Sequence, residues 1–154
     1  MDKLLLILST TRRSNKCIKE AIDIASKSNI PLIILFVVDE EIPQKILEKM
    51  TEDGWIGGKP TESLFNAVLE EYSAQGKEKV AEIEEMARSR GVQFESIIRK
   101  GKFLDEALAV VNAENVKLIL VTRRKRLSVS RFFFGSAVAE LRKRVSCEVR
   151  IIDE

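Results

Sequence analysis

The chain contains 154 residues, with 26 lysines and arginines against 24 aspartates and glutamates, and it has no histidine. This length predicts one domain, and a hydrophobic fraction of 45% with 32% charged residues excludes general disorder. The lack of histidine excludes Ser–His and Cys–His catalytic pairs and the usual zinc sites.

Two apolar runs near the start of the chain predict strands that are buried on both faces of a parallel sheet. The runs are Lys3–Leu8 and Leu32–Val38. Between them, apolar residues recur at three- and four-residue spacings from Cys17 to Ala25, which predicts an amphipathic helix. Ser14 or Asn15 is suited to cap its start. The Asn-Ile-Pro sequence that follows predicts its end, because a residue before proline avoids helical geometry.

The segment around residues 40–63 is the least regular part of the chain and is interpreted as a variable insertion. It either closes over a crevice through Trp55 and Ile56 or forms exposed surface, since glycines surround these residues. A long helix is predicted from about Ser63 to Arg90. Gly76 in its middle costs about 1 kcal/mol relative to alanine, which favours a break or kink there.

The remaining pattern alternates strands with helices to the end of the chain. The alternating segment Val92–Arg99 predicts a strand that is exposed on one face. It is followed by a predicted helix at Phe103–Asn112 and a buried strand at Leu118–Val121. The last two predicted elements are a helix at Ser136–Val145 and a strand at Glu148–Ile152. Five alternations predict right-handed βαβ units. The expected fold is therefore α/β, with an open five-stranded parallel sheet covered by helices on both faces, in a single domain over residues 1–154.

Composition also restricts the partners. No apolar run approaches the ~18 residues of a membrane helix, and the first run lacks the features of a signal peptide. The two cysteines, Cys17 and Cys147, have no metal or disulfide spacing. We therefore expect a cytoplasmic protein with no membrane partner, no metal site and no catalytic residues that can be nominated.

Ligands of open α/β sheets bind beyond the carboxyl ends of the strands, where the strand order reverses. This rule directs attention to the loops Ser9–Ser14, Asp39 onward and Thr122–Phe134. The last loop ends in Gly135-Ser136 at a helix start, where free N–H groups and the helix dipole favour phosphate. The alternative is that Gly135 only permits a turn and Ser136 only caps the helix.

The whole chain resembles a universal stress protein domain. The resemblance is carried by the opening strand, the LIILFVVD strand with its closing acid, the RKG–helix–KLILV segment and the ending FFFGSAVAELRKRVSCEVRII. It implies a five-stranded, nucleotide-binding-like α/β fold, a homodimer joined through the last strand, and a role in survival under stress. Members of the family divide into those that bind ATP and those that do not.

The chain departs from the signature of the ATP-binding branch, which has Gly-x-x-Gly, nine residues, and then Gly followed by Ser or Thr. Only Gly135 and Ser136 match, because Thr122 and Lys125 replace the two earlier glycines. Ser9 stands where the family has an acid. Side chains at the glycine positions crowd the path of a triphosphate. The nucleotide or anion candidates are Ser9, Val38, Thr122, Arg124, Lys125, Gly135 and Ser136.

The leading interpretation is a non-enzymatic, homodimeric stress-response protein with a degenerate nucleotide site and no cofactor. Val149 and Ile151 on the last strand are the dimer interface candidates, because an exposed edge strand pairs readily with another chain. The alternative is a switch that binds ATP through Gly135-Ser136 and the basic loop 123–126, whose side chains replace the missing backbone cradle. A nucleic-acid partner is not expected, since Phe132–Phe134 after the basic loop are expected to be buried.

Overall fold

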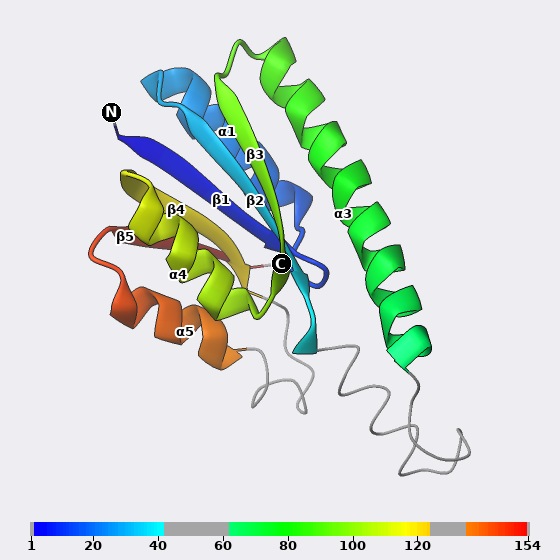
Figure 1. The fold of residues 1–154 in the computed structure, drawn as a ribbon. Helices are drawn as coiled ribbons and strands as arrows, with labels where there is room; N and C mark the ends of the chain where they lie inside the picture. The colour runs from blue at the N-terminus through cyan, green and yellow to red at the C-terminus, as the bar shows by residue number, and fades with distance from the viewer. Residues whose placement is uncertain (1, 42–61, 124–134, 154) are drawn as a thin grey trace.

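The computed structural model describes residues 2–41, 62–123 and 135–153, and these form one five-stranded sheet with helices on both faces (Figure 1). The strands are all parallel in the order β3-β2-β1-β4-β5, which confirms the predicted fold class. The elements are β1 (Lys3–Ser9), α1 (Asn15–Ser28), β2 (Leu32–Asp39), α3 (Glu62–Ser89), β3 (Phe94–Gly101), α4 (Phe103–Ala113), β4 (Val116–Arg123), α5 (Gly135–Arg144) and β5 (Glu148–Asp153). The predicted insertion around residues 40–63 lies almost entirely outside the described residues.

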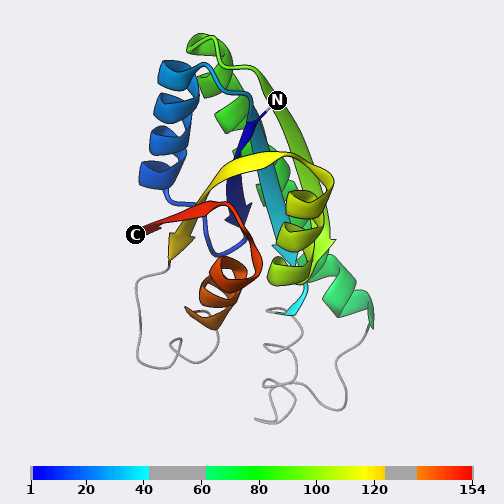
Figure 2. The ribbon, with the colours of Figure 1, turned by 90° about the vertical axis from the view of Figure 1, so that its left-hand side faces the viewer.

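Two apolar cores lie on opposite faces of the sheet, because side chains alternate along each strand. Leu4, Leu6 and Leu8 of β1 pack toward α1 and α3, whereas Leu5 and Ile7 pack toward α4 and α5. The two views of the ribbon place the helix pairs on either side of the strands (Figure 2). Strands β1 and β2 are therefore almost completely buried, as the unbroken apolar runs predict.

Helix α1 begins and ends where the sequence predicts. Ser14 is the N-cap residue by its extended backbone, although its side chain makes no capping hydrogen bond. Asn29 is the C-cap residue in the left-handed conformation, with φ of 53°, and its N–H donates to the carbonyl of Ala25. A left-handed residue is a common helix stop, and asparagine tolerates it better than most residues do.

Helix α3 runs without interruption through Gly76, so the predicted break at this glycine is wrong. A Cβ atom added at Gly76 would lie 2.8 Å from two ring carbons of Phe36, which is a fully buried residue of β2. The glycine is therefore a site of close approach between the helix and the sheet. Its cost in helix propensity is offset by the contact that it permits.

Strand β3 is an edge strand and follows the predicted alternation only in part. Ile97 packs into the core under α4, and Phe94 packs against the core under α3, whereas Ile98 is 38% exposed. Val92 is buried but precedes the strand, so the strand begins later than predicted. An edge strand has a neighbour on one side only, and this leaves part of its surface uncovered.

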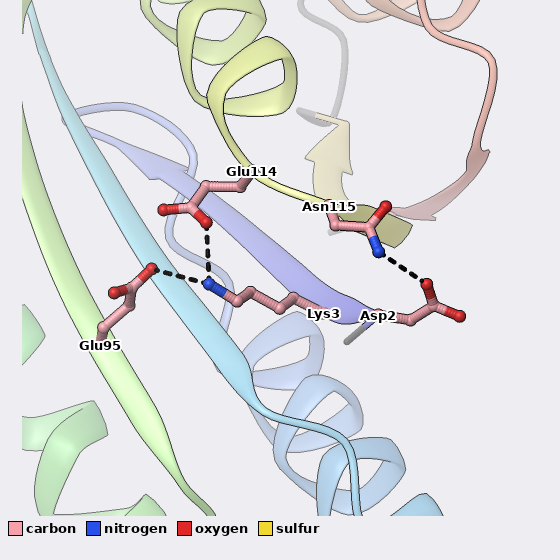
Figure 3. A network of polar contacts seen from close by, with 5 residues as sticks. All are labelled: Asp2, Lys3, Glu95, Glu114 and Asn115. Carbon is pink, nitrogen blue, oxygen red and sulfur yellow. Dashed lines mark hydrogen bonds and ion pairs between the residues drawn. The ribbon is translucent and has the colours of Figure 1, made fainter.

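A network of polar contacts links the amino ends of the strands (Figure 3). Lys3 Nζ donates to Glu114 Oε2 at 2.8 Å and forms a longer ion pair with Glu95 Oε1 at 3.7 Å. Beside this pair, Asn115 Nδ2 donates to Asp2 Oδ1 at 3.0 Å. These side chains are all partly or largely exposed. The network therefore ties β1 to β3 and to the α4–β4 turn at the surface.

Candidate functional site

The polar side chains that the described residues bury lie at the carboxyl ends of the strands and in the turn after β1. They are Ser9, Arg12, Asp39 and Thr122, with exposures of 0%, 2%, 6% and 0%. Ser9 ends β1, Asp39 ends β2 and Thr122 lies one residue before the end of β4. In this strand order, β1 and β4 flank the point where the order reverses, so the buried polar groups surround the expected ligand position.

The chain turns back on itself directly after β1. The N–H of Ser9 donates to the carbonyl of Arg12 at 2.9 Å, and the N–H of Arg12 donates to the carbonyl of Ser9 at 3.1 Å. The Ser9 hydroxyl accepts the N–H groups of Thr11 at 3.4 Å and Arg12 at 3.1 Å. Ser9 is thus a structural residue of the turn, and its hydroxyl oxygen is already engaged by the backbone.

This turn carries the side chain of Arg12 inward against helix α4. The guanidinium carbon of Arg12 lies 4.5 Å from the ring centroid of Phe103, the first residue of α4. A cation over an aromatic face is stabilised by the ring quadrupole, and more strongly so when it is removed from water. A guanidinium remains charged at any physiological pH, so Arg12 places a permanent positive charge inside the carboxyl edge.

Thr122 faces the opposite side of the sheet, toward Cys17 at the start of α1. Burial raises the pKa of the Cys17 thiol to about 11, and the neighbouring Thr122 hydroxyl offsets part of this rise. Their contact lacks the geometry of a full hydrogen bond, so the buried Thr122 oxygen has no hydrogen-bond partner among the described residues. Thr122, which the resemblance described above aligns with a signature glycine, therefore has a fully buried side chain.

Val38 and Asp39 end β2 at the same edge of the sheet. Val38 is fully buried in the core under α1 and α3. The Oδ1 atom of Asp39 accepts the N–H of Glu41 at 2.9 Å, which fixes the direction of the chain as it leaves the strand. In its present position Val38 acts as a core residue, and Asp39 places a buried acidic group at the carboxyl end of β2.

The structure describes part of the predicted glycine turn. Gly135 begins α5 and Ser136 is its second residue, so both lie at a helix N-terminus as predicted. Arg124 and Lys125 fall outside the described residues. Arg123, the first residue of the basic loop, forms a bidentate pair with Asp153 of β5, with N–O distances of 2.7 and 3.1 Å. That arginine therefore links β4 to β5.

Arg12 is a buried residue at this edge that no sequence pattern identifies. Its neighbour Arg13 is exposed, and nothing in the local pattern separates the two arginines. The only signal is the position of Arg12 three residues after a buried strand, where a tight turn reverses the chain.

The two dimer candidates contribute to the protein's own core. Val149 is 6% exposed, and both Val149 and Ile151 pack with the residues under α4 and α5. Among the described residues, strand β5 pairs with β4 alone, at the end of the sheet order. What this strand presents outward is therefore mainly its backbone edge, flanked by the exposed side chains of Glu148 and Asp153.

Two further features bear on the chemistry of the described part of the chain. No group of three or more Cys, Asp or Glu residues is placed there to hold a metal ion. None of its helices has both the length and the apolar character required to cross a bilayer.

Comparison with known proteins identifies relatives of the whole chain. The model of the universal stress protein family matches residues 1–153. No curated protein gives a significant match.

Among solved structures, the chain is similar to the universal stress protein UspA from Lactobacillus plantarum, with 17% identity, a TM-score of 0.72, and coverage of 98% of this chain and 97% of that one. It is also similar to a universal stress protein in complex with cAMP, with 16% identity, a TM-score of 0.63 and coverage of 99% and 98%. A third similar structure is the universal stress protein from Archaeoglobus fulgidus in complex with dAMP. Its sequence identity is 13% and its TM-score 0.61, and the match covers 99% of this chain and 98% of that one. At these identities the likeness establishes the fold.

Proposed function

Because the chain belongs to the universal stress protein family, we propose that it is a cytoplasmic, non-enzymatic stress-response protein that acts as a homodimer with a degenerate nucleotide site. In this proposal residues 1–154 form one domain with a variable insertion around residues 40–63. The observation that carries the proposal is the burial of the Ser9 and Thr122 side chains. Both replace signature residues of the ATP-binding branch, and both side chains are fully buried in the carboxyl edge.

The arrangement of these two residues argues against the family's triphosphate pose. The Ser9 hydroxyl accepts two backbone N–H groups, so it does not offer a ligand what a free carboxylate would offer. The Thr122 side chain adds bulk to a turn in which glycine lets phosphate approach the backbone. A triphosphate would therefore find fewer hydrogen-bond acceptors for its sugar and less space for its phosphates.

The proposed dimer uses the free edge of β5, centred on Val149 and Ile151. Support comes from the position of β5 at the end of the sheet, because an unpaired strand edge is a template for a second strand. A two-fold contact of this kind joins identical surfaces. The 17.5-kDa chain is then expected to sediment at about twice its monomer mass.

Analytical ultracentrifugation at micromolar concentration tests the dimer. Ile151→Lys places a charge on the proposed interface and is expected to give monomers. Ile98→Lys, on the opposite edge strand β3, is the matched control and should leave the dimer intact. Circular dichroism checks that both variants fold. A monomeric wild-type protein, or loss of the dimer only in Ile98→Lys, contradicts the proposed interface.

A second candidate function is an adenine-nucleotide switch at the N-terminus of α5. It is favoured by the similarity to universal stress proteins in complex with cAMP and with dAMP. Weak ATP binding is expected to raise the melting temperature by only about 1–2 °C at a ligand concentration equal to Kd. No shift at millimolar ATP with magnesium argues against the switch. Nucleotide released from the purified protein, detected by mass spectrometry, argues for it and against an empty site.

A further inference from the structure

The outer side of strand β3 presents backbone groups that no described residue pairs. The strand lies at the end of the strand order, and it pairs with β2 without a shift of register. The carbonyl of Gln93 accepts the N–H of Leu32 at 2.8 Å, and the carbonyl of Gly101 accepts the N–H of Glu40 at 3.1 Å. Alternate residues of a parallel strand bond to the same neighbour, so the odd-numbered residues from 93 to 101 face β2. The residues of β3 whose N–H and C=O groups point away from the sheet are Phe94, Ser96, Ile98 and Lys100.

Three side chains of β3 lie on the face that α4 covers, and two of them carry opposite charges. Ile97 packs into the core under α4, and Glu95 and Arg99 flank it two residues away on either side. The side chains of Glu95 and Arg99 are 49% and 47% exposed. Each forms one long ion pair, Glu95 with Lys3 at 3.7 Å (Figure 3) and Arg99 with Glu106 at 3.8 Å. These distances exceed that of a hydrogen bond, so both charges keep surface and bonding capacity for another partner.

This pattern is complementary to itself when two copies of β3 run antiparallel. When Ile97 lies opposite the partner's Ile97 across a two-fold axis, Glu95 faces the partner's Arg99 and Arg99 faces the partner's Glu95. A shift by two residues in either direction places Glu95 opposite the partner's Ile97 or the partner's Gly101, and both charge pairs are lost. Opposite charges that face each other stabilise a pair of strands, and like charges destabilise it. The charges of β3 therefore select one register of self-pairing.

The backbone of β3 agrees with this register. In an antiparallel pair, residues that exchange hydrogen bonds alternate with residues that do not, and facing side chains are closest at the second kind. The outward-pointing residues face one another here, with Ser96 opposite the partner's Ile98, so they form the hydrogen-bonded pairs. Glu95 and Arg99 then lie at the closer, non-hydrogen-bonded positions. The pairing also gives a cross-strand neighbour to Ile98, which is 38% exposed.

We propose that the outer side of β3 is a second self-association edge, at which two copies of this chain pair antiparallel through Glu95–Arg99 ion pairs. The contact is separate from the proposed β5 dimer, because β3 and β5 lie at opposite ends of the strand order. Its Kd is expected to be about 100 µM, since the contact is short and its ion pairs stay partly exposed. A chain that uses both edges at once joins dimers end to end at high protein concentration.

Sedimentation of the full chain at low salt, from about 1 to about 500 µM, tests the inference. Wild-type protein is expected to gain mass across this range, and added salt should reduce the gain. Glu95→Arg and Arg99→Glu each create two like-charge pairs in the contact, and each should raise its Kd by about tenfold or more. The matched control is Lys100→Glu, which makes the same change of charge on the other face of the strand. It should change the Kd by less than about threefold.

A mixture of the two charge-reversal variants gives a sharper test. Glu95→Arg protein and Arg99→Glu protein face each other with two pairs of opposite charge, so they should associate together although neither associates alone. A mixture of Glu95→Arg with Lys100→Glu has the same net charge but one repulsive pair. This control mixture should not reproduce the association.

Three outcomes overturn the inference: wild-type protein with no species at 500 µM beyond those at 1 µM, association that the charge reversals leave unchanged, and variants that do not associate when mixed. Circular dichroism checks the folding of each variant. If a reversal fails to fold, Glu95→Gln and Arg99→Gln decide, because weaker association supports the contact and unchanged association overturns it. The β5 dimer is read separately at micromolar concentration, where Ile151→Lys should dissociate it and the β3 variants should not.

Discussion

Polar side chains are exposed to solvent at the amino edge of the sheet and buried at its carboxyl edge. At the amino edge, Lys3 and Glu114 form a short ion pair in contact with solvent, with side-chain exposures of 29% and 27%. At the carboxyl edge, Arg12 and Thr122 are buried with exposures of 2% and 0%. Exposed pairs add little to stability and cost little, whereas buried polar groups are expensive unless they are completed. The comparison shows that the fold exposes its ion pair at the amino edge and concentrates its buried polar side chains at the carboxyl edge.

The two cysteines give the largest expected difference between the edges. Cys17 contacts Thr122 at the carboxyl edge and is fully buried, with a thiol pKa of about 11. Cys147 precedes β5 at the amino edge and is partly exposed, although burial also raises its pKa. At pH 8, about one Cys17 thiol in a thousand is ionised, and burial blocks access to it.

Labelling with a thiol-specific disulfide reagent at pH 8 checks this difference. Cys147 is expected to react at least about a hundredfold faster than Cys17 in the native protein. Cys147→Ser should remove the fast phase and Cys17→Ser the slow one, and unfolding in urea should make both residues react alike. Two fast thiols in the native protein would show that the carboxyl edge is open to solvent.

Two glycines with positive φ, one at each edge of the sheet, test whether side chains are packed more closely at the carboxyl edge than at the amino edge. Gly101 ends β3 with φ of 155°, and a Cβ atom there would lie 2.9 Å from Glu106 Oε2. Gly91, on the amino side of the same strand, has φ of 69° and no atom within 4 Å of such a Cβ. Gly101→Ala is expected to cost about 2–3 kcal/mol of unfolding free energy, and Gly91→Ala about 1 kcal/mol.

Urea unfolding of the two alanine variants measures this order. Equal losses would mean that the side chain of Glu106 moves away freely and that only the backbone conformation matters. A larger loss for Gly91→Ala would contradict the assignment of crowding to the carboxyl edge.

Thr122→Val tests the cost of a buried polar group directly. The substitution keeps the shape of the side chain and removes a hydroxyl that has no hydrogen-bond partner in the described part of the chain. The variant is expected to be more stable than wild type by about 1 kcal/mol, measured by urea unfolding. Ser9→Ala is the contrasting variant and should lose stability, since the Ser9 hydroxyl accepts two N–H groups. A destabilised Thr122→Val protein would make that hydroxyl part of the fold.

The sequence predicted the elements well because their signals are local. Unbroken apolar runs identified β1 and β2, and the helix stop at Asn29 followed from the proline two residues later. The break expected at Gly76 was wrong because the reason for that glycine lies in Phe36, a residue of another element. Propensity describes an isolated helix, and a contact between distant segments overrides it.

The sequence predicted where the candidate site lies in the fold better than it predicted which residues are buried there. Ser9, Thr122 and Gly135 lie at the carboxyl edge because the α/β topology places them there. Arg12 could not be distinguished from Arg13 in the sequence, since its burial depends on the backbone bonds between Ser9 and Arg12. Burial of a charge is a property of the turn and of Phe103 together, and no local pattern encodes it.

The smallest expected effect belongs to the amino edge, and it is read from the pH dependence of stability. The hydrogen bond to Glu114 raises the pKa of Lys3 above its ordinary 10.5, and the bond from Lys3 lowers the pKa of Glu114 below its ordinary 4.5. A raised lysine pKa stabilises the fold below pH 10.5, and the effect is lost as the pH rises through the folded-state value. A lowered glutamate pKa stabilises it above pH 4.5, and the effect is lost as the pH falls.

The Lys3–Glu114 pair is therefore at full strength between about pH 5 and pH 10. Lys3→Met should reduce stability slightly within this window, and its difference from wild type should shrink as the pH falls below 4.5 and Glu114 becomes protonated. Urea unfolding at pH 3, 7 and 10 measures the profile, and Arg88→Met, in an exposed pair within α3, is the matched control for a surface charge. A Lys3→Met loss as large as that of Gly101→Ala would mean that the amino edge, too, depends on a desolvated charge, and the contrast between the two edges would fail.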